Sequence, residues 1–380
     1  MSAAVRVGSG GTHMRAAIWP GLNEPMRIDL IPLPEAGAGE VRIKVAACGV
    51  CHSDLHVLRG EVRFPAPAVL GHEVSGVIDQ IGLNVFGYEV GDRVVGSFIL
   101  PCGDCWQCDA GRDDLCETFF AENRLKGNLL DGTTRLTDSK GHRLSMYSMA
   151  GLAEYAVIPA TAITEVPAQI PLAEAAVLGC AGLTAYGAIR AAERIGPGIS
   201  VAVVAVGGIG SSLIQIASHL GASPIIAIDI DDAKLASALA LGADIGIDGR
   251  DVQLSQRVLD ATGGRGVQVA FEALGRPETF HQALSLLAPG GRLVAVGIAD
   301  RDTAANIPIT PLVRRGVSIV GSFGGSPRNE LPAVVQLATE GGYDVRSVVT
   351  ARYTLDHVQQ AYDDLAARRI TGRAIVVMDD

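Results

Sequence analysis

The sequence has few aromatic residues and few charged residues, and acidic side chains predominate among the charges. Phenylalanine, tryptophan and tyrosine make up 4% of the 380 residues, and 41 acidic residues against 31 lysines and arginines give a net charge of −10. This balance repels phosphate backbones and anionic lipid, and so argues against a protein that binds nucleic acid or a membrane surface. With 46 glycines and 48% hydrophobic residues, the chain fits a two-domain α/β enzyme better than an all-β sandwich.

Targeting signals and disulfide patterns are also lacking. Residues 1–13 have no apolar core of the signal-peptide kind, so we expect a disordered leader there and a cytoplasmic protein. Residues 195–228 contain no Asp, Glu, Lys or Arg, but six glycines and two prolines interrupt them. A parallel-sheet unit buried on both faces explains this stretch better than a membrane span. An odd number of cysteines, seven, favours metal binding in a reducing compartment.

Four of the seven cysteines lie close together in residues 102–116. Cys102, Cys105, Cys108 and Cys116 supply four thiolates, which suit a closed tetrahedral zinc site. This segment has no hydrophobic core of its own, so a bound metal would hold it together. Free buried cysteines, an iron–sulfur cluster or a zinc ribbon for nucleic acid are alternatives, and the acidic residues of the segment count against the last.

The order of expected strands and helices indicates a Rossmann domain inserted into a split catalytic domain. Short strands and turns fill residues 14–101, with strands at 40–47, 74–81 and 93–95. Beyond residue 175, strands at 200–206, 224–229, 267–271 and 292–296 alternate with helices, including 232–241 and 277–287. This alternation predicts right-handed crossovers and a doubly wound parallel sheet. We assign residues 14–181 and 323–380 to a mostly-β catalytic domain and residues 182–322 to the Rossmann domain.

A glycine-rich turn joins the first strand of the predicted Rossmann domain to its first helix. Residues 205–210 follow the pattern G-x-G-x-x-G, except that Ala205 replaces the first glycine, a change that we expect the turn to tolerate. A pyrophosphate would bind at the start of the helix that follows. The residues predicted to bind it are Gly207, Gly208, Ile209 and Gly210.

The choice of cofactor depends on the end of the next strand. Asp229 follows Gly210 by 19 residues, which is the place of a carboxylate that binds ribose hydroxyls. Asp229 would repel a 2′-phosphate, and Lys234, also a predicted cofactor contact, is the only basic residue nearby, so NAD is favoured over NADP. A helix N-cap role for Asp229 stays open, although Asp231 and Asp232 are better placed for it.

A second set of metal ligands is dispersed along the chain. Cys51, His72 and Cys180 could form the open site of a catalytic zinc ion, which needs three protein ligands and a vacant position. No spacing rule selects these three residues. Cys48 and Cys51 could equally be half of a different metal site or a redox pair, so the residues by themselves leave the choice open.

Several motifs together resemble the zinc-dependent medium-chain alcohol dehydrogenases. They are G-V-C-H-S-D-L-H at residues 49–56, G-H-E at 71–73, the four-cysteine segment, G-C at 179–180 and the glycine-rich turn, in the order of that family. The resemblance runs from about residue 14 to the C-terminus and implies a GroES-like catalytic domain with two zinc ions per chain. It implies Cys51, His72 and Cys180 as ligands of the catalytic zinc and Cys102, Cys105, Cys108 and Cys116 as ligands of the structural zinc.

The same resemblance implies roles for further residues. It assigns Glu73 to a carboxylate behind the metal, Asp54 to the partner that orients the zinc histidine, Ser53 and His56 to a proton relay, His52 and Arg373 to pyrophosphate contacts, Thr184 to a nicotinamide neighbour, and Phe98 to a wall of the substrate pocket. From the residues alone, a surface histidine at position 56 and capping or backbone-bonding hydroxyls at positions 53 and 184 remain open. Cys48 has no family role, and we expect it to be a buried, apolar-like thiol.

We therefore expect a zinc- and NAD-dependent alcohol dehydrogenase that acts on primary alcohols, aromatic or medium-chain. A glutathione-dependent formaldehyde dehydrogenase is the alternative, because the polar residues 123–148 resemble the longer loop of that branch and of dimeric alcohol dehydrogenases. A zinc- and NAD-binding protein without activity is a more remote alternative. The long loop favours a homodimer, and we expect no nucleic-acid or membrane partner.

Overall fold

The computed structural model describes residues 6–7, 12–299 and 302–378, and the chain divides into two compact units. The first unit comprises Met1–Leu183, Ser326–Thr339 and Val349–Asp380. The second comprises Thr184–Gly325 and Glu340–Val348. The first unit is thus discontinuous in sequence, and the second is largely formed by the chain inserted between its parts.

Three segments group differently from the expected domain boundaries: residues 182–183 fall in the first unit, and residues 323–325 and 340–348 fall in the second. Glu340–Val348, which the sequence analysis assigned to the catalytic domain, belongs to the second unit. Its contacts explain the assignment: the Tyr343 hydroxyl lies 2.8 Å from Ser212 Oγ, and the Asp344 N–H donates to Gln215 Oε1 at 2.9 Å. Both partners lie on helix α4 (Gly208–His219), so the segment is held by side chains more than a hundred residues earlier.

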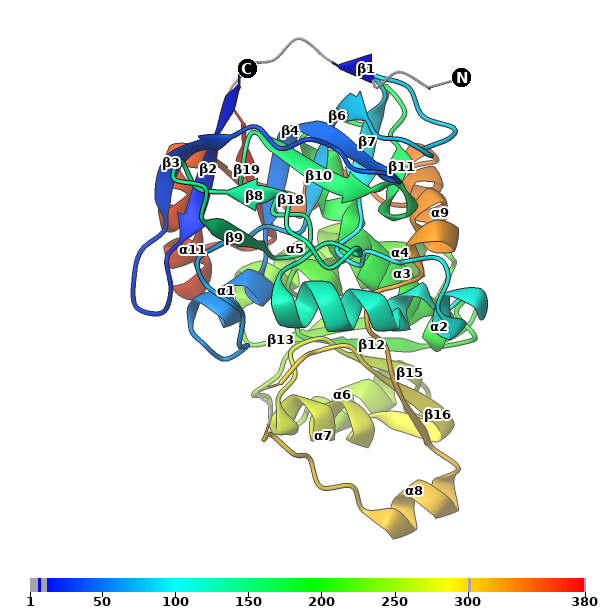
Figure 1. The fold of residues 1–380 in the computed structure, drawn as a ribbon. Coiled ribbons are helices and arrows are strands. Elements are labelled where there is room, and N and C mark those ends of the chain that lie inside the picture. Colours follow the sequence, from blue (N-terminus) through cyan, green and yellow to red (C-terminus); the bar gives the residue numbers. More distant parts are fainter. Residues whose placement is uncertain (1–5, 8–11, 300–301, 379–380) are drawn as a thin grey trace. The chain divides into compact units, whose positions relative to one another are not determined.

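Two mostly antiparallel sheets form the framework of the first unit (Figure 1). The larger sheet runs, in spatial order, β11 (Ile163–Glu165), β7 (Arg93–Gly96), β6 (Val74–Ile81), β4 (Glu40–Val50), β19 (Arg373–Val377) and β18 (Val349–Thr354), with β1 (Arg6–Val7) paired to β6 and β10 (Tyr155–Pro159) paired to β4. The smaller runs β3 (Arg27–Pro32), β2 (His13–Trp19), β5 (Ala68–Val69), β9 (Arg143–Met146) and β8 (Leu136–Thr137). The C-terminal strand β19 therefore pairs with β4, far from it in sequence.

Part of the expected disordered leader is ordered. Arg6 and Val7 pair antiparallel with Ile81 and Gln80 of β6, and His13 begins β2. Strand pairing supplies backbone hydrogen bonds that a composition-based reading cannot anticipate. The prediction of a disordered leader is therefore wrong for residues 6–7 and 12–13, and residues 1–5 and 8–11 lie outside the described residues.

Short helices and a long loop complete the first unit. The helices are α1 (His52–Leu58), α2 (Trp106–Asp109), α9 (Pro327–Thr339), α11 (Val358–Ala366), the 3₁₀ turns η1 (Asp113–Leu115), η3 (Ala160–Ala162), η4 (Glu174–Gly179) and η5 (Leu355–His357), and the π-helix η2 (Phe119–Arg124). In the loop at residues 123–148, the Arg135 guanidinium donates to both oxygens of Glu40 at 2.7 and 2.8 Å. This bidentate pair fixes the loop to strand β4.

The second unit contains a parallel sheet of six strands (Figure 1). The spatial order is β14 (Ile245–Asp248), β13 (Ile225–Asp229), β12 (Val201–Val204), β15 (Val267–Glu272), β16 (Leu287–Ala295) and β17 (Ser318–Gly321), which is the Rossmann order. The helices are α3 (Ala181–Ala191), which begins in the first unit, α4, α5 (Asp232–Ala240), α6 (Leu254–Ala261), α7 (Pro277–Ser285), α8 (Ile309–Arg315) and α10 (Val345–Val348). The predicted α/β fold with a parallel-sheet domain is confirmed.

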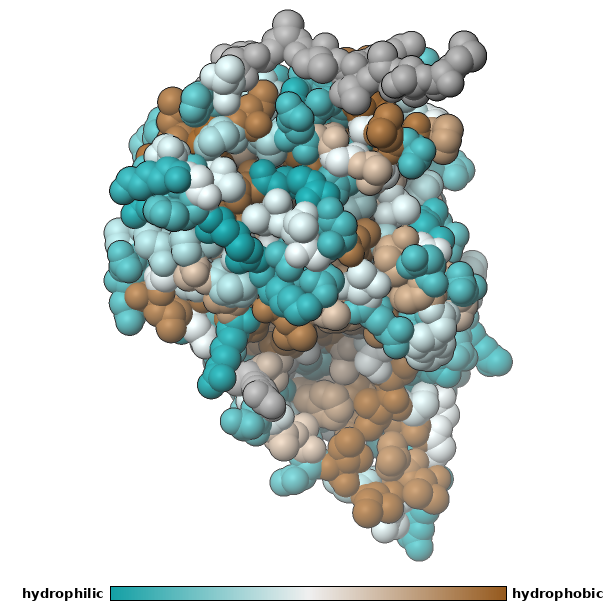
Figure 2. All heavy atoms as spheres, in the orientation of Figure 1, coloured by the Kyte–Doolittle hydropathy of each residue, from teal (hydrophilic) through white to brown (hydrophobic). Residues whose placement is uncertain are grey.

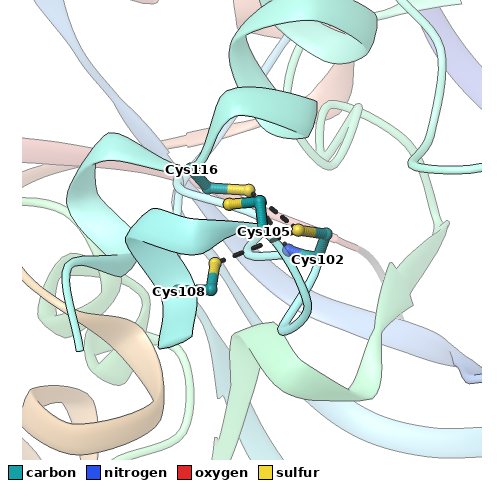
Figure 3. A group of neighbouring side chains, drawn as sticks. All are labelled: Cys102, Cys105, Cys108 and Cys116. Carbon is teal, nitrogen blue, oxygen red and sulfur yellow. Dashed lines mark hydrogen bonds between the residues drawn. The ribbon is translucent and has the colours of Figure 1, made fainter. Parts of the chain in front are cut away.

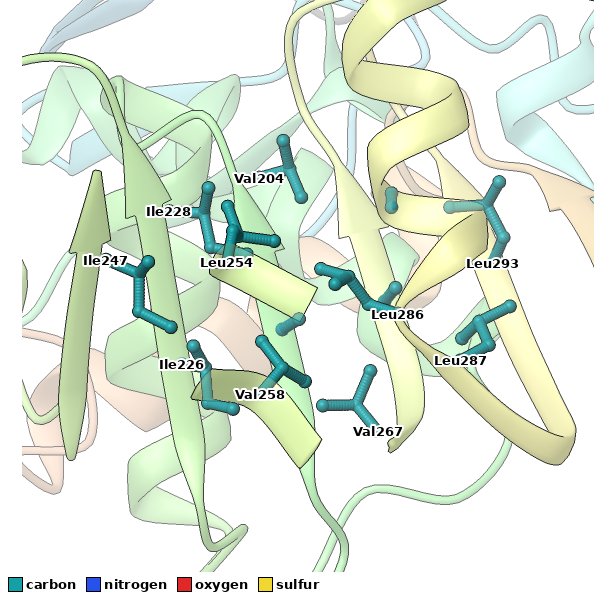
Figure 4. Close-up of a cluster of buried hydrophobic side chains, with 13 residues drawn as sticks. Val204, Ile226, Ile228, Ile247, Leu254, Val258, Val267, Leu286, Leu287 and Leu293 are labelled. Carbon is teal, nitrogen blue, oxygen red and sulfur yellow. The ribbon is translucent and has the colours of Figure 1, made fainter. Parts of the chain in front are cut away.

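The core of the second unit lies against the face of the sheet that α6 and α7 cover. Leu254 and Val258 of α6 pack with Val204 and Ile226 of the central strands (Figure 4). Alternate residues of a strand point to opposite faces, so Val203 points the other way, toward α4. A sheet buried on both faces explains why these strands are almost continuously hydrophobic.

The uncharged stretch at residues 195–228 contains β12, α4 and most of β13. Its hydrophobic residues are accounted for by the buried strands and the buried face of α4. Among the described residues, no helix combines the length and the apolar character needed to cross a membrane.

The glycine-rich turn brings strand β12 and helix α4 unusually close together. A Cβ atom on Gly210 would lie 2.2 Å from the carbonyl oxygen of Ala205, so only glycine fits there. Ala205 itself has a φ of +74°, in the left-handed region that glycine adopts without steric cost. The alanine that replaces the first glycine of the motif is thus tolerated at the cost of backbone strain.

Relief of this strain should stabilise the protein. We expect Ala205→Gly to raise the free energy of unfolding by about 0.5–1 kcal/mol, because the steric cost of positive φ, about 1–2 kcal/mol, exceeds the entropic cost of glycine. Urea unfolding measures the change. The matched control is Ala233→Gly in α5, where the same substitution should lower stability by about 1 kcal/mol. Equal destabilisation by both changes would contradict the strain argument.

Candidate active site and metal centres

Cys51, His72, Glu73 and Cys180 come together within the first unit. Cys51 directly follows β4 and precedes α1, His72 and Glu73 precede β6, and Cys180 follows η4. One ligand atom from each lies within 4.8 Å of the others, and all four side chains are buried. Cys180 Sγ is 3.6 Å from His72 Nε2. Two thiols and an imidazole nitrogen at this separation fit the donor set of a zinc site.

The orientation of the His72 ring is set by Asp54. His72 Nδ1 lies 3.2 Å from Asp54 Oδ1, which also accepts the Gly71 N–H at 3.0 Å. Because Nδ1 faces this carboxylate, Nε2 is directed toward the thiols, as in the carboxylate–histidine pairs of metal sites. Asp54 has no exposed surface and lies on α1, two residues after the helix begins.

The thiols of Cys51 and Cys48 differ in acidity. A hydrogen bond with Cys180 lowers the pKa of the Cys51 thiol well below its usual range, and the positive charge of Arg373 acts in the same direction. A lowered pKa favours the thiolate, which is the form that binds metal. Cys48, by contrast, is fully buried, and burial raises the pKa of its thiol. It is absent from the cluster, as expected of an apolar-like thiol.

Glu73 and Arg373 form a buried ion pair beside this cluster. Glu73 Oε1 lies 3.1 Å from Arg373 Nη1 and 4.0 Å from His72 Nε2. Burial raises the pKa of Glu73 to about 7, against the opposing effect of the Arg373 charge. Gly49 of β4 leaves room for the carboxylate, since a Cβ atom there would lie 2.1 Å from Oε2. Arg373, expected at a pyrophosphate, thus contacts Glu73 at the start of β19.

The residues of the expected proton relay lie on one short helix. Ser53 Oγ is 3.7 Å from Cys51 Sγ, and His56, one turn further along α1, contacts the Glu61 carboxylate through Nδ1. The His56 side chain is about one-third exposed, so it reaches solvent. Ser53 is half-buried and His52 is exposed. Helix α1 therefore carries groups leading from the buried cluster to the surface.

Aromatic side chains border the cluster. The Phe98 ring is centred 6.0 Å from the His72 ring, and the Tyr147 ring is centred 5.7 Å from it. Phe64 meets Tyr147 edge-on at 5.0 Å. Phe98 was expected to line a substrate pocket. Tyr147 is not among the predicted site residues, because it lies within the polar loop at residues 123–148 and no motif singles it out.

The four-cysteine segment forms a second donor set. The Sγ atoms of Cys102, Cys105, Cys108 and Cys116 lie within 4.8 Å of one another, and their side chains point together (Figure 3). Backbone N–H groups of Cys102 and Phe119 donate to Cys116 Sγ at 3.3 and 3.4 Å. Four sulfurs with such supporting donors fit a closed zinc site.

An arginine ties this segment to helix α9. Arg328 Nη2 donates to the Cys108 carbonyl at 2.7 Å and lies 2.7 Å from Asp113 Oδ1. Asp113 is fully buried, and Arg328, through hydrogen bonds and charge, keeps its pKa below the usual range although burial acts in the opposite direction. Arg328 also places a positive charge near the thiols.

The glycine-rich turn and Asp229 form the candidate nucleotide site of the second unit. Asp229 lies at the end of β13, and its carboxylate accepts the N–H groups of Val206 at 2.7 Å and Ile230 at 2.8 Å. Asp231 caps α5, so Asp229 is not the N-cap. The N-cap residue of α4 is Gly207, which has no side chain that could accept hydrogen bonds from the first turn of the helix. The N–H groups of that turn therefore stay available to an anion.

Two further predicted cofactor residues, Lys234 and Thr184, lie in the second unit, whereas His52 and Arg373 belong to the first. Lys234 is half-buried on α5, and its N–H lies 3.4 Å from Asp231 Oδ1. Thr184 is buried on α3, in the part of that helix that belongs to the second unit. Their roles as cofactor contacts remain predictions.

Comparison with known proteins identifies the family of both units. Residues 37–168 match the family described as "Alcohol dehydrogenase GroES-like domain", and residues 208–340 match the family "Zinc-binding dehydrogenase". The chain is 31% identical over 369 residues to an alcohol dehydrogenase of Geobacillus stearothermophilus, which covers 96% of this chain and 100% of the relative. It is 33% identical over 357 residues to a protein of Schizosaccharomyces pombe described as "Probable S-(hydroxymethyl)glutathione dehydrogenase 1", with 92% of this chain and 93% of the relative covered.

Solved structures agree with these sequence relatives. The fold matches benzyl alcohol dehydrogenase from Acinetobacter calcoaceticus with a TM-score of 0.89 and 31% identity, over 97% of this chain and 99% of that one. Two structures at 25% identity and a TM-score of 0.82, each covering 97% of this chain and 100% of its own, are described as bound to NADH (Escherichia coli CFT073) and to NADP (Sinorhizobium meliloti 1021). The protein is accordingly an oxidoreductase acting on alcohols. The chain belongs to the zinc-dependent medium-chain alcohol dehydrogenase family.

Proposed function

We propose that this protein is a zinc- and NAD-dependent alcohol dehydrogenase that interconverts primary alcohols, aromatic or medium-chain, and their aldehydes by hydride transfer. The observation that carries the proposal is the buried cluster of Cys51, His72 and Cys180, in which Asp54 turns a ring nitrogen toward two thiols. Phe98 and Tyr147 beside His72 favour an apolar or aromatic substrate.

The proposal gives each side chain of the cluster a part. Cys51, His72 and Cys180 would hold the catalytic zinc, and Cys102, Cys105, Cys108 and Cys116 would hold a structural one. A bound zinc ion supplies Lewis acidity, which lowers the pKa of an alcohol hydroxyl. The charges of two thiolates offset those of the ion, and Arg373 offsets that of Glu73. Asp54 keeps the His72 ring in the binding tautomer.

Proton removal would follow helix α1. Ser53, close to Cys51, is placed to take the hydroxyl proton of an alcohol, and His56 is placed to deliver it to solvent with Glu61 as its partner. A positioned acid–base group contributes about 10²–10⁴-fold to rate. These residues would therefore clear the proton without being the main source of acceleration.

Metal content provides the decisive test. We expect two zinc ions per chain by elemental analysis and loss of benzyl alcohol oxidation after chelation. Cys180→Ala should retain one zinc and lose more than about a hundredfold in activity, since loss of an outer partner alone costs about 10–100-fold. The matched control is Cys48→Ala, also a buried cysteine, which should keep both ions and its activity. Undiminished turnover without metal would exclude the proposal, and two zincs with NAD binding but no turnover would indicate a non-catalytic protein.

Asp229 supports NAD over NADP in this proposal. Its carboxylate is fixed at the end of β13 by backbone N–H groups, where a 2′-phosphate would meet a negative charge. We expect kcat/KM to favour NAD, and Asp229→Ser to shift the NAD-to-NADP ratio toward NADP by at least about tenfold, because like-charge contacts cost several kcal/mol. Asp260→Ser, with the same charge change at an exposed position of α6, should leave the ratio unchanged. An unchanged ratio in Asp229→Ser would contradict this assignment.

A second candidate function is supported by the S. pombe relative. An S-(hydroxymethyl)glutathione dehydrogenase acts on an adduct of formaldehyde and glutathione, so oxidation of formaldehyde only in the presence of glutathione would favour this alternative. Benzyl alcohol oxidation that is independent of glutathione favours the main proposal.

We also propose that the protein is a homodimer formed through the second unit. Strand β17 is an edge strand, and its unpaired backbone can bind a second strand. The helix that precedes it in sequence, α8, has no buried residue, and hydrophobic side chains gather over this region (Figure 2). Ile309 is 75% exposed and Val313 71% exposed. Such an exposed apolar patch is typical of an interface.

Sedimentation tests the dimer directly. We expect a dimer for the unaltered protein and a monomer for Val313→Asp, because a buried unpaired carboxylate would oppose association. Val252→Asp, at a valine that is 99% exposed outside this patch, is the control and should remain dimeric. A Val313→Asp protein that stays dimeric would place the interface elsewhere.

A further inference from the structure

Arg124 stacks on one of the aromatic residues that border the candidate active site. Its Cζ atom lies 4.4 Å from the centre of the Tyr147 ring. Tyr147 is 1% exposed, and its ring contacts the His72 ring. A single aromatic ring therefore separates the guanidinium from a ligand of the proposed catalytic zinc.

The charge of Arg124 has no carboxylate partner among the described residues. Arg135, in the same loop, is bound by Glu40 and Asp131, and Arg373 is bound by Glu73. No acidic oxygen of the described chain lies within ion-pairing distance of Arg124, although its side chain is only half-exposed. A partly buried guanidinium stacked on a ring keeps donors free for a ligand.

A buried hydrogen-bond network fixes this arginine in place. The neighbouring Asn123 is fully buried and donates to the carbonyls of Asn128, Met146 and Ser148 at 2.8–3.2 Å, while its Oδ1 accepts the Ser148 N–H at 2.9 Å. Asn123 thus holds the π-helix η2, which ends at Arg124, against the residues on both sides of Tyr147.

The same network reaches the other aromatic wall. Ser148 Oγ donates to the Phe98 carbonyl at 2.8 Å. π-Helical turns are rare and occur frequently at functional sites. Arg124, Tyr147 and Phe98 therefore form a rigid arrangement rather than a chance contact of an exposed loop.

We propose that Arg124 recognises a carboxylate on the substrate, so that the preferred alcohols carry an anionic group one aromatic ring away from the reacting hydroxyl. This rests on the proposed alcohol dehydrogenase activity. Tyr147 would contact the apolar body of the substrate, and the guanidinium would bind the carboxylate through paired N–H donors. A positive charge at this place attracts such substrates in a protein whose net charge is −10. The chemistry admits two sources: an aromatic acid bearing a hydroxymethyl group, or a glutathione adduct.

The test compares substrates that differ only in the carboxylate. For 4-(hydroxymethyl)benzoate against benzyl alcohol, kcat/KM should favour the acid, and Arg124→Met should reduce this ratio of the two kcat/KM values about ten- to a hundredfold. Arg124→Lys should retain part of the preference. Arg346→Met removes the same charge from an exposed position and should change nothing. S-(hydroxymethyl)glutathione as a third substrate distinguishes the two sources.

Two results would overturn the proposal. If the substrate preference is the same with and without Arg124, this residue does not bind the carboxylate. If Arg124→Met lowers oxidation of both alcohols equally, its role is only to support Tyr147. Calorimetric binding of 4-(hydroxymethyl)benzoate to the zinc-loaded protein separates the two proposals. If the unaltered protein oxidises no alcohol but binds 4-(hydroxymethyl)benzoate, and Arg124→Met loses this binding, the dehydrogenase function is contradicted and the carboxylate site is not.

Discussion

Asp54 holds the position on which the candidate active site depends. Its buried carboxylate accepts a hydrogen bond from the Gly71 N–H and faces His72 Nδ1. A buried carboxylate is costly unless such partners satisfy it. The contact between Asp54 Oδ1 and His72 Nδ1 therefore also orients the His72 ring, so that Nε2 faces Cys51 and Cys180. Without this contact, the two thiols would lack their third partner.

The first unit concentrates opposite charges around this point. Glu73 and Arg373 pair without access to solvent, and the pKa of Glu73 is raised to about 7 by burial. Such groups contribute little to stability, because desolvation consumes much of the attraction between them. Their arrangement instead sets the potential at the thiols, where Arg373 favours the charged form of Cys51. Arg124 adds a second positive charge on the far side of Tyr147. In a protein with a net charge of −10, these two arginines place positive charge beside the candidate metal ligands and beside Tyr147.

The second unit uses backbone geometry more than side-chain charge. Gly210 permits α4 to approach β12, and Asp229 accepts a hydrogen bond from the Val206 N–H of the turn itself. The carboxylate proposed to select NAD therefore also shapes the turn that would receive the pyrophosphate. This double role explains why the turn accepts a strained alanine at position 205: the surrounding hydrogen bonds hold the backbone in a conformation that alanine disfavours.

Features that depend on local spacing were available from the sequence. The four cysteines of residues 102–116 lie close in space because the chain between them is short. The strand at residues 74–81 and the helix at 232–241 were predictable from the spacing of hydrophobic residues and from the glycines that bound these elements. The order of motifs identified the family. Tertiary structure alone decided that Arg373 faces Glu73, that residues 340–348 pack on α4, that residues 6–7 pair with β6, and that Arg124 stacks on Tyr147. These pairs are distant in sequence, and no short-range pattern encodes which partner a buried side chain meets when sheets and loops pack together.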